Sequence, residues 1–442
     1  MSRGTAFRRL CALAVIALAA SCSSKAADEG STDPTSGPGS GAESETDAVG
    51  VTADTVKISM IYADLSALSE QNLAPEIGIA KDQAEAVVAE INENGGVAGR
   101  QIELVSHVIE GAEAVLSPEA GRAACLAATE DDKPFAVVVT AAIGAEVIQC
   151  VAGEHDALTI AMDSFPESYF EEAEGRLFSV GSHLSMNRTR EYRAWPGLLD
   201  EPAGLSDKTI GIIRTEEPQD EEAVEEALKP AIEELGYEVA AEAVLPCPDG
   251  SQNCAQHDAA IEKMKAAGVD FVFLTAQLLA GAATVGAAKN LNFDPEWATV
   301  GNNITKTVAQ FYAPTKDAYD GAWGLDTTFL DFSEDAKACN ATVVAAGGEE
   351  FPEGSDGFGF TSNTCRQIQI LAEAIDSVDG AITHAKVISA IEDLGELDLI
   401  SGPKGSLSKE KHDAGDYVFL SRYSADTEIF EPYDDRKPLK VP

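Results

Sequence analysis

The chain has 442 residues, of which 45% are hydrophobic and 24% charged, and this is enough apolar material for about two domains. Its 31 basic and 75 acidic residues give a formal charge of −44. This charge argues against a nucleic-acid partner, because no basic stripe is present that could release counterions from phosphates. It predicts a soluble, self-repelling surface instead.

The first 22 residues predict an export signal. Three arginines precede an apolar run from Leu10 to Ala20, which is too short to span a bilayer. The run ends in Leu18-Ala19-Ala20-Ser21-Cys22, which resembles a bacterial lipobox. We therefore expect a signal peptide over residues 1–21 and a lipid on Cys22, with a plain secretory signal as the alternative.

The segment that follows predicts a disordered tether over residues 22–50. It consists of Ser, Gly, Asp, Glu, Thr and Pro with almost no large apolar residue. Such a segment cannot bury enough surface to offset the entropy of ordering. No other window of the chain approaches a transmembrane run.

A strand–helix–strand unit then opens the folded part. Val56–Tyr62 and Ile102–Ile109 predict strands, and apolar residues between them recur at helical spacing from Ile77 to Ile91. Asn94-Gly95-Gly96 supplies the left-handed residues that end a helix. The unit therefore predicts a parallel strand pair joined by a right-handed crossover.

The end of this crossover carries a family resemblance. Ile91-Asn92, Gly95-Gly96-Val97 and Gly99-Arg100 before an apolar strand resemble the first crossover of type I periplasmic binding proteins. The match is best to the branched-chain-amino-acid-type solute receptors of ABC importers, and the order of elements agrees over roughly residues 51–430. The resemblance implies an α/β fold of two Rossmann-like, doubly wound parallel-sheet lobes joined by a three-segment hinge. It assigns residues 51–180 and 322–402 to lobe 1, and residues 181–321 and 403–442 to lobe 2.

The first lobe offers candidate ligand residues after its strands. Phe135–Thr140 and Leu158–Met162 predict buried parallel strands, and ligands of open parallel sheets sit at their carboxyl ends. The resemblance implies that the loops after these strands hold the carboxylate and ammonium of an amino acid. Asp64 and Ser66 follow the first strand, and either bind ligand or cap the next helix. The candidates in this lobe are Asp64, Ser66, Thr140, Ala142, Ile143, Gly144, Asp163 and Ser164.

The second lobe begins its strand–helix units at Thr209–Arg214. Its candidate ligand residues are Glu216, Gln277 and Asn302, which follow strands, and a turn or cap role is the alternative for the last two. The crossings between the lobes are expected at Leu177–Gly181, Ala322–Thr328 and Gly402–Gly405, and the tail Glu431–Pro442 is expected to be loose.

Six of the eight cysteines remain once Cys11, in the signal, and Cys22 are set aside. An even number in an exported chain predicts disulfides. Fifteen connectivities are possible, and locality favours the pairs Cys125–Cys150, Cys247–Cys254 and Cys339–Cys365. Zinc bound by Cys247, Cys254 and His257 is the alternative for the second pair, although no fourth ligand is close.

The sequence lacks the motifs that mark common enzymes. No Gly-x-Ser-x-Gly follows a strand, and no His-Glu-x-x-His or P-loop is present. We predict a non-enzymatic, solute-binding lipoprotein that closes on an amino acid or similar polar organic ligand and delivers it to the permease of an ABC importer. A ligand-sensing lipoprotein that signals to a partner is the alternative. The prediction includes no cofactor or metal, a monomer, and a location at the cell surface or in the periplasm.

Overall fold

The computed structural model describes residues 46–71, 74–111, 113, 117–140, 144–247, 254–276, 278–300 and 313–442. The predicted signal peptide, the lipidation candidate Cys22, and four predicted ligand residues lie outside these ranges. Those four are Ala142, Ile143, Gln277 and Asn302.

The first sheet is fully parallel. Its strands are β1 (Thr55–Asp64), β2 (Gln101–Glu110), β3 (Ala136–Val139), β4 (Leu158–Ala161) and β5 (Leu177–Ser179), in the spatial order β2-β1-β3-β4-β5. Between β1 and β2 the chain forms helix α2, so the parallel pair predicted from the opening unit is confirmed.

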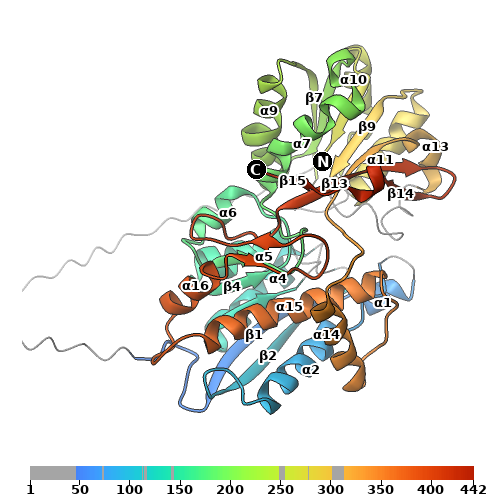
Figure 1. Cartoon of the computed structure of the whole chain (residues 1–442). Helices are drawn as coiled ribbons and strands as arrows, with labels where there is room; N and C mark the ends of the chain where they lie inside the picture. The colour runs from blue at the N-terminus through green and yellow to red at the C-terminus, as the bar shows by residue number, and fades with distance from the viewer. Residues whose placement is uncertain are drawn as a thin grey trace, which may run out of the picture. The chain divides into compact units, whose positions relative to one another are not determined.

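Both faces of this sheet are covered. Successive strand residues point to opposite sides, so each strand contributes side chains to a core on either face. Ala136 and Val138 of β3 pack in a core with α2, α14, α15 and α16, whereas Val137 and Val139 pack in a core on the other face. In Figure 1, α2, α14 and α15 run alongside one another on the first face. The helices of this lobe are α1 (Ser66–Ser69), α2 (Ala80–Glu93), α4 (Pro118–Leu126), η1 (Ala127–Asp131), α5 (Ala145–Ile148), η2 (Gln149–Glu154), α6 (Glu167–Glu172), α14 (Glu334–Ala345), α15 (Asp356–Asp376) and α16 (His384–Glu392).

The second sheet combines a parallel core with an antiparallel edge. Strands β7, β6, β8, β9 and β10 are parallel neighbours in that order, and β13 adds antiparallel to β10. The strands are β6 (Ile210–Thr215), β7 (Val239–Leu245), β8 (Phe271–Leu274), β9 (Glu296–Val300), β10 (Trp323–Asp326), β13 (Tyr417–Ser424), β14 (Ile429–Pro432) and β15 (Leu439–Lys440). The helices that accompany them are α7 (Arg188–Ala203), η3 (Leu205–Asp207), α8 (Pro218–Ala223), η4 (Val224–Leu228), α9 (Lys229–Glu234), α10 (His257–Ala266), α11 (Leu278–Asn290), η6 (Ala313–Thr315), α13 (Lys316–Tyr319) and η7 (Asp434–Arg436).

The lobe boundaries expected at residues 322 and 403 both lie further along the chain than predicted. The strand expected to return to the first lobe is β10, which belongs to the second sheet, so the chain crosses after Asp326. The small antiparallel pair β11 (Glu396–Leu397) and β12 (Gly405–Ser406) occupies the position expected for the third crossing. Ala414 still packs in the core of the first sheet, and Val418 packs in a core of the second, so the chain crosses between these two residues.

A buried histidine joins the three crossings. His183 follows β5, and its Nε2 donates a hydrogen bond to the carbonyl of Pro403 (2.9 Å). Its Nδ1 accepts from the amides of Asp416 and Tyr417, each at 3.2 Å. The ring also meets that of Phe329 edge-on, at 5.2 Å between centroids. Burial lowers the pKa of His183 to about 4, so the ring is neutral at physiological pH.

The C-terminal tail is ordered, contrary to expectation. Its strand β15 pairs with β13, and the side chain of Val441 is buried. The guanidinium of Arg190, on α7, donates to the carbonyls of Val441 (3.2 Å) and Pro442 (3.0 Å). The sequence analysis missed this contact because the tail carries few large apolar residues and its partner lies about 250 residues away.

The three cysteine pairs favoured by locality are present as disulfides: Cys125–Cys150, Cys247–Cys254 and Cys339–Cys365. The zinc alternative is therefore wrong, because Cys247 and Cys254 bond to each other. His257 instead contacts Thr284 Oγ1 and the carbonyl of Cys254, each at 3.0 Å. Among the described helices, none is both long and apolar enough to cross a membrane.

Candidate functional site

The interlobe cluster comprises Asp163, Ser164, Arg188, Glu191 and Asp220. Asp163 and Ser164 directly follow β4 of the first lobe, and Asp220 lies in the first turn of α8, just after β6 of the second. Arg188 and Glu191 occupy the first turn of α7, where the chain enters the second lobe. The cluster thus combines the carboxyl end of a strand from one sheet with two helix starts beside the other.

Arg188 connects the two sides of this cluster. Its Nη2 donates to the carbonyl of Ser164 (3.0 Å), and its backbone amide donates to the carbonyl of Phe165 (2.8 Å). Its Nη1 lies 3.7 Å from a carboxylate oxygen of Asp220, with the two side chains 14% and 11% exposed. A guanidinium in this position attracts the carboxyls of both lobes.

The three carboxyls of the cluster are buried or half-buried, and the cluster contains one guanidinium to offset their charge. Desolvation raises the pKa of Glu191 to about 7, although Arg188 opposes the rise. Desolvation likewise raises the pKa of Asp163 and of Asp220, and Arg188 again lowers both. Three carboxyls therefore face Arg188 in a site of low solvent access, with a weaker attraction from Arg214 on Asp220, and this site favours binding of hydrogen-bond donors.

The Ser164 hydroxyl is the unsatisfied polar group of the cluster. Ser164 is 8% exposed, and its Oγ forms no well-aligned hydrogen bond with a described residue. The hydroxyl does lie toward Glu191, where it helps to lower the pKa of that carboxyl. A buried hydroxyl without a partner is costly, and a bound molecule could supply the missing bond.

An apolar pocket of about 490 Å³ is lined by none of the five cluster residues but extends to the residue directly before Asp163. Met162, which precedes Asp163, lines it together with Phe360 of α15. Its wall also includes residues from the crossings, such as Ser182 and Phe329, and Ile400 between β11 and β12. Pockets of this size hold small organic molecules.

Further hydrogen bonds join the lobes next to the cluster. The Ser168 amide, on α6, donates to Glu222 Oε1 of α8 (3.0 Å), and the Ser168 hydroxyl donates to the other oxygen of the same carboxylate. The Glu167 amide donates to Thr189 Oγ1 (3.0 Å), and Asn187 Nδ2 donates to the Glu167 carboxylate (2.6 Å). These contacts hold the lobes together at this edge.

Some of the predicted ligand residues make local bonds. Asp64 Oδ1 accepts from the amide of Ser66 (3.0 Å) and from its hydroxyl (2.6 Å), as expected for a turn at a helix start. Thr140 is buried, with its amide bonded to the Ile61 carbonyl (3.1 Å). At Gly144 a side chain would collide with the Glu146 carboxylate, so this glycine gives that carboxylate its space. Glu216 accepts from the Cys247 amide (2.8 Å) and thereby supports the disulfide loop.

Asp163 and Ser164 are the predicted residues that the structure brings together, and Arg188, Glu191 and Asp220 were missed. The sequence did carry a signal for the helix that bears Arg188 and Glu191, because the residue before it, Asn187, is a strong N-cap residue. Its Oδ1 accepts from the amides of Thr189 and Arg190, at 2.9 and 3.2 Å. The sequence analysis assigned no element to this segment, and the helix contains two prolines, Pro196 and Pro202, which are unfavourable inside a helix.

The described residues contain one set of three possible metal ligands: Cys125, Cys150 and His155. The two sulfurs of this set are bonded to each other, so they are not available as thiolates. The interlobe cluster forms no such set of ligands among the described residues.

Comparison with solved structures shows the same fold. A possible leucine/isoleucine/valine-binding protein from Rhodopirellula baltica is 15% identical, with a TM-score of 0.63 and coverage of 88% of this chain and 98% of that one. A branched-chain amino acid transporter substrate-binding protein from Streptococcus pneumoniae, in complex with isoleucine, is 15% identical, with a TM-score of 0.61 and coverage of 88% and 100%. A fatty acid ABC transporter substrate-binding protein from Thermomonospora curvata is 16% identical, with a TM-score of 0.60 and coverage of 90% and 97%.

The two-lobed fold predicted from the sequence is thus confirmed. A search of curated proteins finds no significant match. The family description "Periplasmic binding protein" matches residues 55–428, which include both sheets and the interlobe cluster. Because this match spans most of its length, the chain belongs to the periplasmic binding protein family.

Proposed function

We propose that this protein captures a small polar organic molecule between its lobes and delivers it to an ABC importer without altering it chemically. The observation that carries the proposal is the interlobe cluster. It brings charged groups from both sides together and leaves the Ser164 hydroxyl without a well-aligned hydrogen bond. A ligand that touches both lobes binds the closed arrangement preferentially and so shifts the population toward it. A permease would recognise that closed form.

The ligand class that fits the described residues is an amino acid or a similar molecule with a cationic group and an apolar part. The excess of carboxyls over guanidinium favours an ammonium-type donor. The adjoining apolar pocket accommodates a side chain. Structural neighbours include proteins whose names refer to leucine, isoleucine and valine, which supports this class.

We further propose that the mature chain is attached to the outer side of the bacterial membrane through a lipid on Cys22. The apolar run and the Leu-Ala-Ala-Ser-Cys sequence support this proposal. Residues 22–50 would then link the anchor to lobe 1, and the second lobe would follow the crossings. Labelling with radioactive palmitate should mark the wild type, and a Cys22→Ala variant should remain unlabelled; an unlabelled wild type would mean a secreted protein.

A thermal-shift screen against amino acids, amides and short organic acids tests ligand capture. Once a ligand is found, Ser164→Ala and Asp220→Asn should each weaken its affinity by about tenfold, since each removes a hydrogen-bonding or charged group. Glu234→Gln, at an exposed position on α9, is the control and should leave the affinity unchanged. Equal affinity in all three variants would remove the interlobe cluster as the ligand site.

A further inference from the structure

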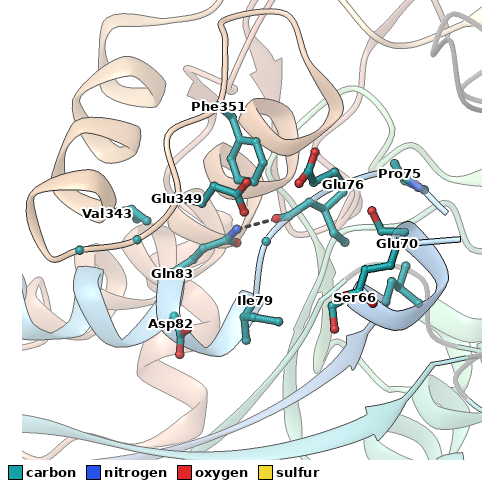
Figure 2. A pocket seen from close by; sticks show the side chains of 16 residues that line it. Ser66, Glu70, Pro75, Glu76, Ile79, Asp82, Gln83, Val343, Glu349 and Phe351 are labelled. Atoms are coloured by element: carbon teal, nitrogen blue, oxygen red, sulfur yellow. Dashed lines mark hydrogen bonds between the residues drawn. The ribbon is translucent and has the colours of Figure 1, made fainter. Parts of the chain in front are cut away.

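A separate pocket of about 390 Å³ lies within the first lobe (Figure 2). Its walls come from the segment between β1 and α2, from the first turn of α2, and from the end of α14 with the loop before α15. None of its lining residues belongs to the interlobe cluster or to the second sheet. Ser66, which the sequence analysis placed at the ligand site, lines this pocket instead.

The pocket wall carries four carboxylates and no basic side chain. These are Glu70, Glu76, Asp82 and Glu349. None of the four forms an ion pair with a described residue, although 27 ion pairs occur elsewhere among those residues. The electrostatic potential inside the pocket is therefore negative, and the pocket attracts cations.

The Gln83 side chain adds a neutral acceptor inside the pocket. Gln83 is 4% exposed, and its Nε2 donates to the Ile77 carbonyl (2.7 Å), as Figure 2 shows. This bond fixes the amide, and Oε1 accepts no hydrogen bond from a described residue. Because Oε1 is not one of the buried atoms without a partner, it is accessible from the pocket and can accept a hydrogen bond from a ligand there.

Two of the carboxyls lie close to each other at the pocket. Desolvation raises the pKa of Glu349, and the charge of Glu76 and a hydrogen bond with its carboxyl raise that pKa further. Figure 2 shows these two side chains projecting over the pocket from different segments of the chain. Two like charges at short range repel, and a cation placed between them relieves the repulsion.

An aromatic ring completes the wall. Phe351 packs against Gly357 at the start of α15, where any Cβ would meet the ring at 2.3 Å. A Cβ at Gly78 would likewise approach the Phe351 ring (3.2 Å) and the Gln83 amide nitrogen (3.0 Å). The ring is thus held beside the acceptors, and its face attracts an ammonium group.

The carboxylates surround the pocket rather than meeting at one point. Among the described residues, they form no group of three ligands close enough to hold a metal ion. A ligand with its charges spread along a chain matches this arrangement better than a compact ion does. Ammonium groups are also donors only, and the side-chain groups identified above are all acceptors.

We propose that this pocket is a second ligand site, for a linear aliphatic polyamine. Its volume suits a small organic molecule, its carboxylates pair with separated ammonium groups, and Phe351 and Gln83 contact the chain between them. Because the pocket lies within one lobe, a polyamine binds there whether the lobes are open or closed. The site is therefore independent of capture between the lobes.

Isothermal titration of the mature chain with spermidine tests this site. The double substitution Glu76→Gln and Glu349→Gln should weaken spermidine binding by about tenfold or more. The matched control is Glu234→Gln with Glu262→Gln, which changes the net charge equally. These two exposed acids of the second lobe form no ion pair with a described residue. The control should bind spermidine as the wild type does, and uncharged 1,4-butanediol should not bind.

All four substitutions are at exposed positions, so both double variants should unfold at the wild-type temperature. Equal weakening in the two double variants would mean that spermidine senses only the overall negative charge, and this would overturn the proposal. Absence of spermidine binding to the wild type would also overturn it. Neither result would bear on ligand capture by the interlobe cluster, because the two sites share no residue.

Discussion

His183 shows how one side chain can tie together segments that are distant in sequence. It lies at the point where β5 leaves the first lobe, and it bonds to residues more than 200 positions away. The ring must donate at Nε2 and accept at Nδ1, so only the neutral form satisfies all three partners. The protonation state of this residue is therefore linked to the stability of the crossings.

Stability should fall as the pH drops from about 6.5 to about 4, in part because of His183. Its pKa is about 4 in the folded chain and 6.5 ordinarily, so the unfolded chain binds the extra proton over this interval. The contribution is complete above pH 6.5 and amounts to about 3 kcal/mol at most. Urea unfolding at several pH values should show this slope reduced in His183→Asn. The same slope in both proteins would contradict the assignment.

Glu191 should change stability with pH in the opposite direction to His183. Its pKa is about 7 in the folded chain and 4.5 ordinarily, so the folded chain holds the proton more tightly and loses stability as the pH rises from 4.5 to 7. We expect Glu191→Gln to be more stable than the wild type by about 2–3 kcal/mol at pH 8, with the advantage gone at pH 4.5. Chemical denaturation at both pH values measures the difference. Glu201→Gln, at an exposed site on the same helix, is the control and should show no such change.

At the scale of single residues, the sequence analysis predicted Asp163 and Ser164 because strand ends are easy to locate from apolar runs. It could not assign Asp64 and Ser66, since an acidic residue after a strand serves equally as ligand or turn former. The structure bonds these two to each other. Arg188 was missed because its importance depends on a carbonyl and a carboxyl supplied by other segments.

Among the elements, long amphipathic helices and buried strands were predicted well, and α7 was not. Asn187 marks its start, but the sequence analysis assigned no element to this segment, in which two prolines weaken the helical pattern. Tertiary packing outweighs their intrinsic cost, because Tyr192, Trp195 and Leu199 of this helix are almost fully buried against the second sheet. Local propensity alone could not reveal that compensation.

A disulfide that closes a longer loop should contribute more to the free energy of unfolding. Cys125–Cys150 closes a separation of 25 residues and Cys247–Cys254 one of 7. Replacing the first pair by alanines should cost about 3 kcal/mol, and replacing the second about 2 kcal/mol, because the longer loop restricts the unfolded chain more. Denaturant unfolding of the two variants gives the comparison. A larger loss from the shorter loop would show that native contacts, and not loop entropy, dominate.

For the whole molecule, the two lobes were predicted from the family resemblance, which the order of strands and helices supports along the chain, and crossover handedness added only the parallel pairing of the first unit. The positions of the second and third crossings were not predictable in the same way. They depend on whether β10 pairs with β9 and on which core receives Ala414, and both are long-range choices. Short strands such as β11 and β12 contain too few residues to show a hydrophobic pattern, so the sequence could not locate the third crossing from them.

The contact between Ser168 and Glu222 should favour the closed arrangement of the lobes. Glu222→Gln replaces a charged acceptor, which should weaken the pair by about 1–2 kcal/mol and raise the fraction of open molecules. Small-angle X-ray scattering of the ligand-free protein should then give a larger radius of gyration. Glu226→Gln, a nearby exposed acid on η4, is the control, and an equal radius in both variants would show that this contact does not hold the lobes together.

The anchored C-terminus has a practical consequence for anyone who prepares this protein. Arg190 binds the last two carbonyls of the chain, and Val441 is enclosed beneath them. An affinity tag fused after Pro442 would therefore begin beside α7, two residues from the start of that helix, rather than in open solvent. A short peptide spacer there would place the tag clear of the guanidinium and leave both bonds intact.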